Sequence, residues 1–234
     1  MNRLEREFEE ARAAGRKSLI VYLCAGDPDL ASTERLVPAL EAAGADIIDL
    51  VARLRGRGCE VPLVLMGYLN PIVRMGVDAF VARSARAGVD GFIVPDLPLE
   101  ESGALGDAAS AKGLSLVLLA APTTPPDRLR SIGQRTRGFL YFVSVTGVTG
   151  ARTALPADLP SRLDVVRAAS VAPVAVGFGV SAPEQARTLA QHADGVVVGS
   201  ALVAEIARSA GATEGPVALV RSLAEAVHSV RRGP

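Results

Sequence analysis

Two carboxylates occupy positions in this sequence that suit acid–base chemistry at the end of a strand. Asp49 follows two isoleucines at the end of an apolar run. A carboxylic acid among aliphatic side chains is harder to ionise, as general acid–base work requires, although such aspartates also bind backbone N–H groups. Asp96 ends another run between Pro95 and Pro98. It either lines a site or caps a helix or turn.

Glycine-rich segments follow two later apolar runs. They are Gly177-Phe178-Gly179-Val180-Ser181 and Gly199-Ser200-Ala201. Glycine lets backbone N–H groups approach an anion, the next helix offers its positive N-terminus, and Ser200 adds a hydroxyl. We therefore favour phosphate binding over the alternative of tight turns alone. Residues 177–182 also match a GxGxxA dinucleotide pattern, but no acidic residue ends the next strand, so NAD binding is not expected.

Residues 144–152 contain glycines among small hydroxyl residues, including Thr149 and Gly150. This composition predicts a mobile lid, with a merely flexible loop as the alternative.

The remaining polar candidates carry weaker signals. No metal site is expected, because His192 and His228 lie on predicted helix surfaces without neighbouring ligands. The segment with Arg53, Arg55 and Arg57 is interpreted as a solvated face rather than a nucleic-acid patch. Cys59 is as consistent with an inert core residue as with a functional one.

Eight short apolar runs alternate with helical patterns along the chain. Near-continuous apolar runs are typical of strands buried on both faces of a parallel sheet. The runs are residues 19–24, 45–50, 61–67, 89–95, 114–121, 138–145, 173–178 and 194–199. Eight such units predict an α/β fold, a (β/α)8 TIM barrel, preceded by an extra helix with Leu4, Phe8 and Ala11 on one face. The unbroken repeat predicts one domain over residues 1–234.

The second crossover of this predicted barrel is unusually short. Only residues 51–60 separate the second run from the third. About ten residues is the lower limit for a parallel crossover, so the second helix must be truncated.

Composition excludes several classes of function. The chain has 25 basic and 25 acidic residues, 4% aromatic residues and no tryptophan. Neither nucleic acid nor an anionic membrane is therefore an expected partner. Two cysteines and a charged first stretch fit a reduced, cytoplasmic location, and no apolar run is long enough for a membrane helix.

Several ordered segments together resemble the tryptophan synthase alpha chain family. They are AGDP at 25–28, LMGYLNP at 65–71, VPDLP at 94–98, APTT at 121–124, VTGVTG at 145–150, VGFGVS at 176–181 and DGVVVGSA at 194–201. The resemblance runs nearly end to end. It implies a (β/α)8 lyase that cleaves indole-3-glycerol phosphate to indole and glyceraldehyde 3-phosphate, without a cofactor of its own. It also implies an α2β2 assembly with a beta chain.

The family's functional residues map unevenly onto this chain. The resemblance assigns phosphate binding to Gly179, Gly199 and Ser200, with Gly150 closing from the lid, and the active-site tyrosine to Tyr141. The position of the first glycine turn in the predicted barrel adds Gly177 to the phosphate site, and we expect Asp96 and Thr149 to support the site. The glutamate that handles the proton at indole C3 falls on Asp49, which is shorter by one methylene.

The chain departs from the family directly after Leu50. A segment resembling GxPxSDPxxDGP, whose last aspartate holds the indole nitrogen, has no counterpart before Val51-Ala52-Arg53. Lyase activity is therefore expected to be impaired. One alternative is a non-catalytic barrel that binds a phosphorylated ligand and regulates a beta chain. Another is a different phosphate-handling barrel enzyme.

Overall fold

The computed structural model of the protein describes residues 2–22, 24, 29–42, 47–48, 54–143, 158–177 and 179–231. Each of the eight predicted runs contains a strand. The strands are β1 (Ser18–Val21), β2 (Ile47–Ile48), β3 (Val64–Met66), β4 (Gly91–Ile93), β5 (Ser115–Ala120), β6 (Leu140–Val143), β7 (Val174–Gly177) and β8 (Gly195–Val198).

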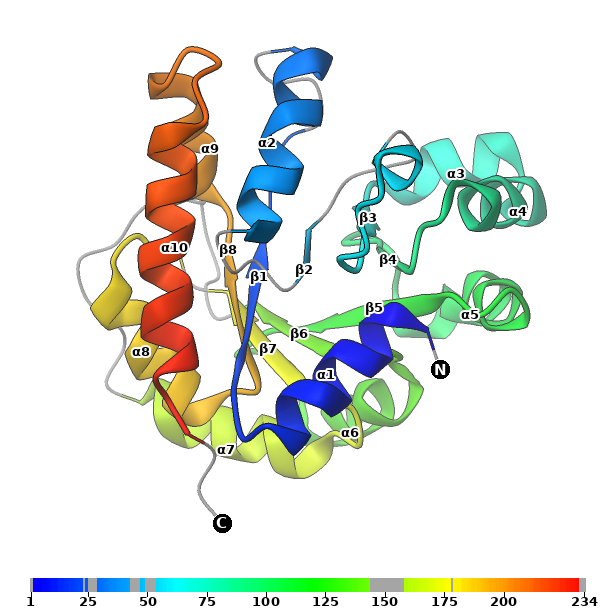
Figure 1. The fold of residues 1–234 in the computed structure, drawn as a ribbon. Coiled ribbons are helices and arrows are strands. Elements are labelled where there is room, and N and C mark those ends of the chain that lie inside the picture. Colours follow the sequence, from blue (N-terminus) through cyan, green and yellow to red (C-terminus); the bar gives the residue numbers. More distant parts are fainter. Residues whose placement is uncertain are drawn as a thin grey trace.

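Helices connect the strands and form the outer layer (Figure 1). The longer helices are α1 (Arg3–Ala13), α2 (Leu30–Ala42), α3 (Leu69–Met75), α4 (Val77–Ala87), α5 (Ser102–Ala111), α6 (Pro126–Arg135), α7 (Leu159–Ala169), α8 (Pro183–His192), α9 (Ser200–Arg208) and α10 (Glu214–His228). Two short 3-10 turns are η1 (Arg55–Arg57) and η2 (Leu99–Glu101). None of the helices in the described residues is long and apolar enough to cross a membrane.

All strand pairs are parallel, in the order β2-β1-β8-β7-β6-β5-β4-β3. Apart from β2 and β3, strands that are neighbours in sequence are therefore neighbours in the sheet, and β8 returns to pair with β1. This is the strand order of a (β/α)8 barrel, so the predicted fold is confirmed. Within the described residues no pairing joins β2 to β3, and the sheet is open at that position.

Alternate strand residues divide the apolar core in two. The larger part lies between the sheet and the helices. The smaller part, which we call the interior cluster, comprises Leu4, Phe8, Ile20, Val64, Ile93, Val117, Phe139 and Ala175.

Helix α1 closes the N-terminal end of the barrel, confirming the predicted extra helix (Figure 1). Its Leu4 and Phe8 belong to the interior cluster. A Cβ atom on Gly138 would lie 2.5 Å from Leu4 Cδ2, and one on Gly91 3.5 Å from the same atom. A Cβ atom on Gly195 would lie 3.4 Å from Phe8 Cε1. Glycines at or just before the strand starts thus leave the space into which the helix fits.

The crossover from β2 to β3 is as short as predicted. Its described part, residues 54–63, contains only the turn η1. Leu54, Cys59 and Leu63 are nevertheless buried, with 1%, 4% and 1% exposure. The core interpretation of Cys59 is confirmed, and the short segment shields the sheet with its own apolar side chains.

Arg55 anchors this crossover, and its predicted place on a solvated face is wrong. Its side chain is 13% exposed, and Nη2 donates to the Asp90 carboxylate at 2.6 Å. Nη1 donates to the carbonyls of Cys59 and Val61 at 2.6 and 2.8 Å, and Nε donates to that of Gly88 at 3.0 Å. The segment is too short for a full helix, so several of its carbonyls need partners, which the guanidinium supplies.

Asp90 completes this network from the start of β4. Its carboxylate also accepts the N–H of Leu63 at 2.9 Å and contacts Arg3 Nη1 at 3.5 Å. The network therefore joins α1, the short crossover and the β3–β4 corner at the N-terminal end of the barrel.

Candidate functional site

The C-terminal ends of β6, β7 and β8 bring three predicted site residues to one rim of the barrel. Gly177 pairs with Val143 on one side and Val197 on the other, and Tyr141 lies two residues before Val143. Gly199 lies two residues beyond Val197. The register thus places Tyr141, Gly177 and Gly199 on neighbouring strand ends.

Tyr141 lies against Gly177 without room for a side chain there. A Cβ atom on Gly177 would be 2.6 Å from the Tyr141 hydroxyl oxygen and 2.9 Å from ring carbon Cε2. The ring packs on the interior cluster, with its centroid 6.4 Å from that of Phe139 in an edge-to-face arrangement. Tyr141 is therefore directed into the barrel, and Gly177 permits that position.

Gly179 and Ser200 begin the turns that follow β7 and β8. Gly179 has φ of +61°, a backbone conformation that glycine adopts at little cost. Ser200 is the first residue of α9, so the first-turn N–H groups of that helix lack intrahelical acceptors. Such donors suit an anion.

The start of α8 is already capped from within the chain. Gln185 Oε1 accepts the N–H groups of Ser181 and Ala182 at 3.0 and 3.2 Å. The backbone donors of these two residues are occupied, which leaves Gly179 and the first turn of α9 as the candidate anion contacts.

Tyr22 is a rim residue that the sequence interpretation missed. It follows β1, and its N–H donates to the carbonyl of Val198 at 2.8 Å. A Cβ atom on Gly199 would lie 3.4 Å from its ring, and its hydroxyl lies 3.6 Å from Cys24 Sγ. Tyr22 lies inside the first predicted run, residues 19–24, and an aromatic residue near the C-terminal end of that run was the available signal.

Asp96 is exposed at the rim and holds a neighbouring helix. Its Oδ1 accepts the N–H of Leu69, the first residue of α3, at 2.9 Å. The capping alternative is thus realised, but on the helix after β3 instead of the one after β4. A carboxylate is favourable at that helix N-terminus.

Asp29 likewise caps the start of α2, where its carboxylate accepts the backbone N–H of Ser32. Hydrogen bonds from the backbone N–H and hydroxyl of Ser32 hold the pKa of Asp29 below its ordinary value.

In the part of the chain that the structure describes, no group of three or more His, Cys, Asp or Glu side chains could hold a metal ion. His192 and His228 are the last residues of α8 and α10.

Three of the predicted site residues, Asp49, Thr149 and Gly150, lie outside the described residues, as does the predicted lid at 144–152. The described site therefore consists of the tyrosine and the glycine turns.

Comparisons with known proteins identify the family to which this chain belongs. The family model for the tryptophan synthase alpha chain matches residues 47–231. The chain belongs to the tryptophan synthase alpha chain family. A family member from Caulobacter sp. (strain K31) is 41% identical over 268 aligned positions, covering 98% of each chain. Another, from Citrifermentans bemidjiense, is 43% identical and covers 91% of this chain and 92% of its own.

Solved structures of the family have the same fold. Tryptophan synthase subunit alpha from Legionella pneumophila superposes with a TM-score of 0.89 at 31% identity, covering 98% of this chain and 100% of that one. A tryptophan synthase chain from Mycobacterium tuberculosis gives a TM-score of 0.84 at 34% identity, covering 97% and 98%.

The alignment lengths also indicate that the Caulobacter family member has residues at positions where the present chain has none. The Caulobacter alignment has 268 positions, whereas 98% of 234 residues is about 229. About 39 aligned positions therefore have no residue here. The family-model match begins at residue 47, in β2, immediately before the short crossover.

Proposed function

We propose that this chain is the alpha subunit of a tryptophan synthase and a carbon–carbon lyase acting on indole-3-glycerol phosphate. The observation that carries the proposal is the rim on which Tyr141, Gly177 and the start of α9 lie at neighbouring strand ends. That rim occurs on a chain that is 41% identical to family members over nearly its whole length.

In this proposal the two ends of the substrate bind to different parts of the rim. The phosphate is held by Gly179, Gly199 and Ser200 with the positive end of α9, and Gly150 closes over it. The indole ring lies toward Tyr141 in the barrel interior. The N–H donors bind the anionic end, and the apolar interior cluster excludes water from the reacting end.

The reaction is a retro-aldol cleavage. A proton is added at indole C3, positive charge develops on the ring nitrogen, and a base removes the proton of the glycerol hydroxyl next to the breaking carbon–carbon bond. The electron pair of that bond returns to the indole ring as glyceraldehyde 3-phosphate leaves. We assign the carboxylate that handles the C3 proton to Asp49.

This chain should catalyse the reaction slowly. Asp49 is one methylene shorter than the glutamate that the family resemblance implies, which withdraws its carboxylate by about 1.5 Å. A misplacement of about 1 Å can reduce a rate about 100-fold. The second carboxylate, beside the indole nitrogen, belongs to the segment for which no residue is present after Leu50.

We further propose that a beta chain docks beside the rim, at an apolar patch on β3 and α3. The patch consists of Met66, Tyr68, Val73 and Met75, whose exposed fractions range from 41% to 69%. Large apolar side chains gathered in this way are typical of interaction surfaces. The missing segment would lie on the same side of the barrel, so we expect a weaker complex than the family forms.

The second candidate is a non-catalytic barrel that binds a phosphorylated ligand and regulates a beta chain. The short crossover favours it, because the phosphate turns do not depend on that segment. Indole release from indole-3-glycerol phosphate, with and without a beta chain, separates the two. Turnover in either assay supports the lyase. Ligand binding without turnover supports the regulator, and neither binding nor turnover contradicts both.

A further inference from the structure

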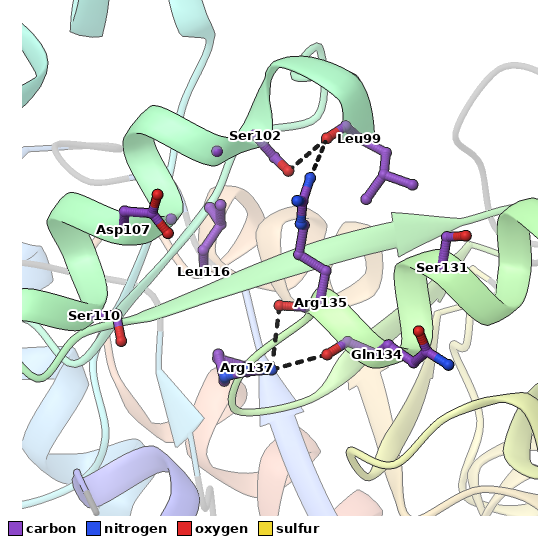
Figure 2. Close-up of a pocket in the computed structure, with 11 residues that line it drawn as sticks. Leu99, Ser102, Asp107, Ser110, Leu116, Ser131, Gln134, Arg135 and Arg137 are labelled. Atoms are coloured by element: carbon purple, nitrogen blue, oxygen red, sulfur yellow. Dashed lines mark hydrogen bonds between the residues drawn. The ribbon is translucent and has the colours of Figure 1, made fainter.

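A groove lies on the outside of the barrel between α5 and α6 (Figure 2). Its volume is about 550 Å³, within the range of small-molecule sites. It is separate from the rim: its floor includes Leu116, near the N-terminal end of β5, while the predicted site lies at the ends of β6 to β8.

Small residues on α5 make the groove wide. Ser102, Gly103, Gly106 and Ser110 line it from this side. A Cβ atom on Gly103 would meet nothing within 4 Å, and one on Gly106 only Leu116 Cδ2 at 3.5 Å. No neighbour therefore requires glycine at these positions. Glycine within a helix costs about 0.5–1 kcal/mol relative to alanine, and here it provides only open space.

Two guanidinium groups face this space from the end of α6 and the residues that follow. Arg135 Nη1 donates to the carbonyl of Leu99 at 3.2 Å, across the groove (Figure 2). Arg137 Nη1 donates to the carbonyls of Gln134 and Thr136, each at 3.0 Å. Within the described residues, the Nε and Nη2 groups of Arg135 and Arg137 have no protein acceptor.

Other arginines of the same helix differ in this respect. Arg128 forms a two-pronged ion pair with Glu100, and Arg130 pairs with Asp127. Neither Arg135 nor Arg137 has a carboxylate partner in the described residues, and Asp107 is the single acidic residue that lines the groove. The lining therefore has a net charge of +1, from two arginines and one aspartate. Each arginine has an edge, formed by Nε and Nη2, that donates to no protein group in the described residues.

We propose that this groove binds a small dianion with one anionic group at each end, and that these groups accept hydrogen bonds from the free edges of Arg135 and Arg137. Figure 2 shows these two guanidinium groups toward the two ends of the groove, Arg135 beside Leu99 and Arg137 beside Gln134. Guanidinium edges match the paired oxygens of a phosphate or a carboxylate. The shared chemistry is two anionic groups held apart on a small molecule, and a dicarboxylate and a phosphorylated carboxylic acid both supply it. The proposal is independent of the phosphate site at the rim.

The test is a titration of the full chain, followed by NMR of backbone amides and of arginine Nε–H groups. Phosphoglycolate is the probe in one arm and succinate in the other. We expect the Nε–H signals of Arg135 and Arg137 and the amides of Gly103 and Gly106 to shift together in at least one arm. The arm that responds identifies the ligand class.

Variants separate the groove from general surface charge. Arg135→Gln with Arg137→Gln should weaken binding at least about tenfold. Arg128→Gln with Arg130→Gln, which also removes two positive charges but outside the groove, should leave it unchanged. Asp107→Asn should strengthen binding severalfold, because it removes a like charge from the groove. A misfolded variant would not bind more tightly, so the Asp107→Asn variant tests the proposal even if the double variant is unstable.

Three results would overturn the proposal. One is a response confined to Gly179, Gly199 and Ser200, which would leave the rim site intact and the groove empty. Another is equal weakening by the double variant of Arg135 and Arg137 and by the double variant of Arg128 and Arg130, which would indicate a nonspecific charge effect. The third is weaker binding in Asp107→Asn.

Discussion

The hydroxyl oxygen of Tyr141 occupies the position next to Gly177 that any larger side chain would need, 2.6 Å from where a Cβ atom would stand. The two residues lie on adjacent strands, β6 and β7, so neither can move away without disturbing the sheet. Glycine at this position therefore has two roles. It opens the rim toward the proposed phosphate, and it lets the tyrosine ring enter the barrel.

Gly177→Ala should displace Tyr141 and lower the free energy of unfolding by about 1–3 kcal/mol, as overpacking in a tight core does. Affinity for an indolyl-alkyl phosphate should fall at least about tenfold. Urea unfolding and calorimetric titration measure the two effects. Gly103→Ala is the matched control, and it should stabilise the chain slightly, because its Cβ atom meets nothing. Equal effects of the two variants would contradict this account.

Glycerol 3-phosphate should raise the melting temperature, because it binds the folded chain and not the unfolded one. Gly179→Asp should abolish the increase, since aspartate strains a backbone with φ of +61° and repels the anion. Gly113→Asp, at φ of +71° in a remote turn with nothing near its Cβ position, controls for backbone strain. The Gly113→Asp variant should still show the increase in melting temperature with glycerol 3-phosphate. An undiminished shift in Gly179→Asp would remove the phosphate assignment.

Arg55→Met should destabilise the chain by about 3–5 kcal/mol, because it leaves the buried carboxylate of Asp90 without its closest partner. Arg3→Met removes a longer contact to the same carboxylate from a side chain that is 34% exposed. It should cost less than about 1 kcal/mol. Chemical denaturation of both variants tests the difference, and similar losses would show that the crossover does not depend on Arg55.

The Glu100 and Arg128 pair should make a pH-dependent contribution to stability. The hydrogen bond from Arg128 lowers the pKa of Glu100 below its ordinary value of 4.5. Because the folded pKa is below the unfolded one, the contribution is present above about pH 4.5 and is lost as pH falls through the folded pKa.

Glu100→Gln should accordingly be less stable than the parent chain at pH 7 and equally stable in strong acid. High salt should reduce the difference, since both side chains are exposed. Glu101→Gln, whose side chain has no ion pair in the described residues, should show no such pH dependence. Urea midpoints across a pH series provide the measurement.

Restoring lyase activity should require two changes together. We expect the parent chain to release only trace indole. Grafting a family-like loop and half-helix between Leu50 and Val51, combined with Asp49→Glu, should restore turnover, whereas Asp49→Glu alone should not. Groups that act as a unit are strongly non-additive. Family-like turnover by the parent chain would contradict the assignment and make Asp96 the first alternative to examine.

The strands were predictable because burial on both faces of a parallel sheet requires apolar side chains at nearly every position, as in β7 (Val174–Gly177). The truncated crossover was predictable from the number of residues between the second and third apolar runs alone. The glycine turns were predictable because only a few residue types suit such turns, so the local sequence reveals them.

Side-chain partners were less accessible to sequence reasoning. Arg55 looked solvated because its local neighbours are polar, whereas its burial depends on carbonyls at Gly88 and a carboxylate at Asp90. Asp96 was correctly expected to cap or to line the rim, but its helix comes earlier in the chain. The groove between α5 and α6 gave no signal, because glycines within a helical pattern do not reveal whether a neighbour fills the space beside them.

The helix that closes the bottom of the barrel has a consequence for the order of events during synthesis. Leu4 and Phe8 leave the ribosome well before Gly195, yet Phe8 is buried against the region of Gly195. Roughly 190 residues must be made in between, which takes on the order of 10–40 s at typical rates of translation. For that time the apolar face of α1 has no final binding site. Helix α1 thus depends on β8 for its final packing, and a chaperone that shields residues 3–13 would protect this apolar face until the barrel can cover it.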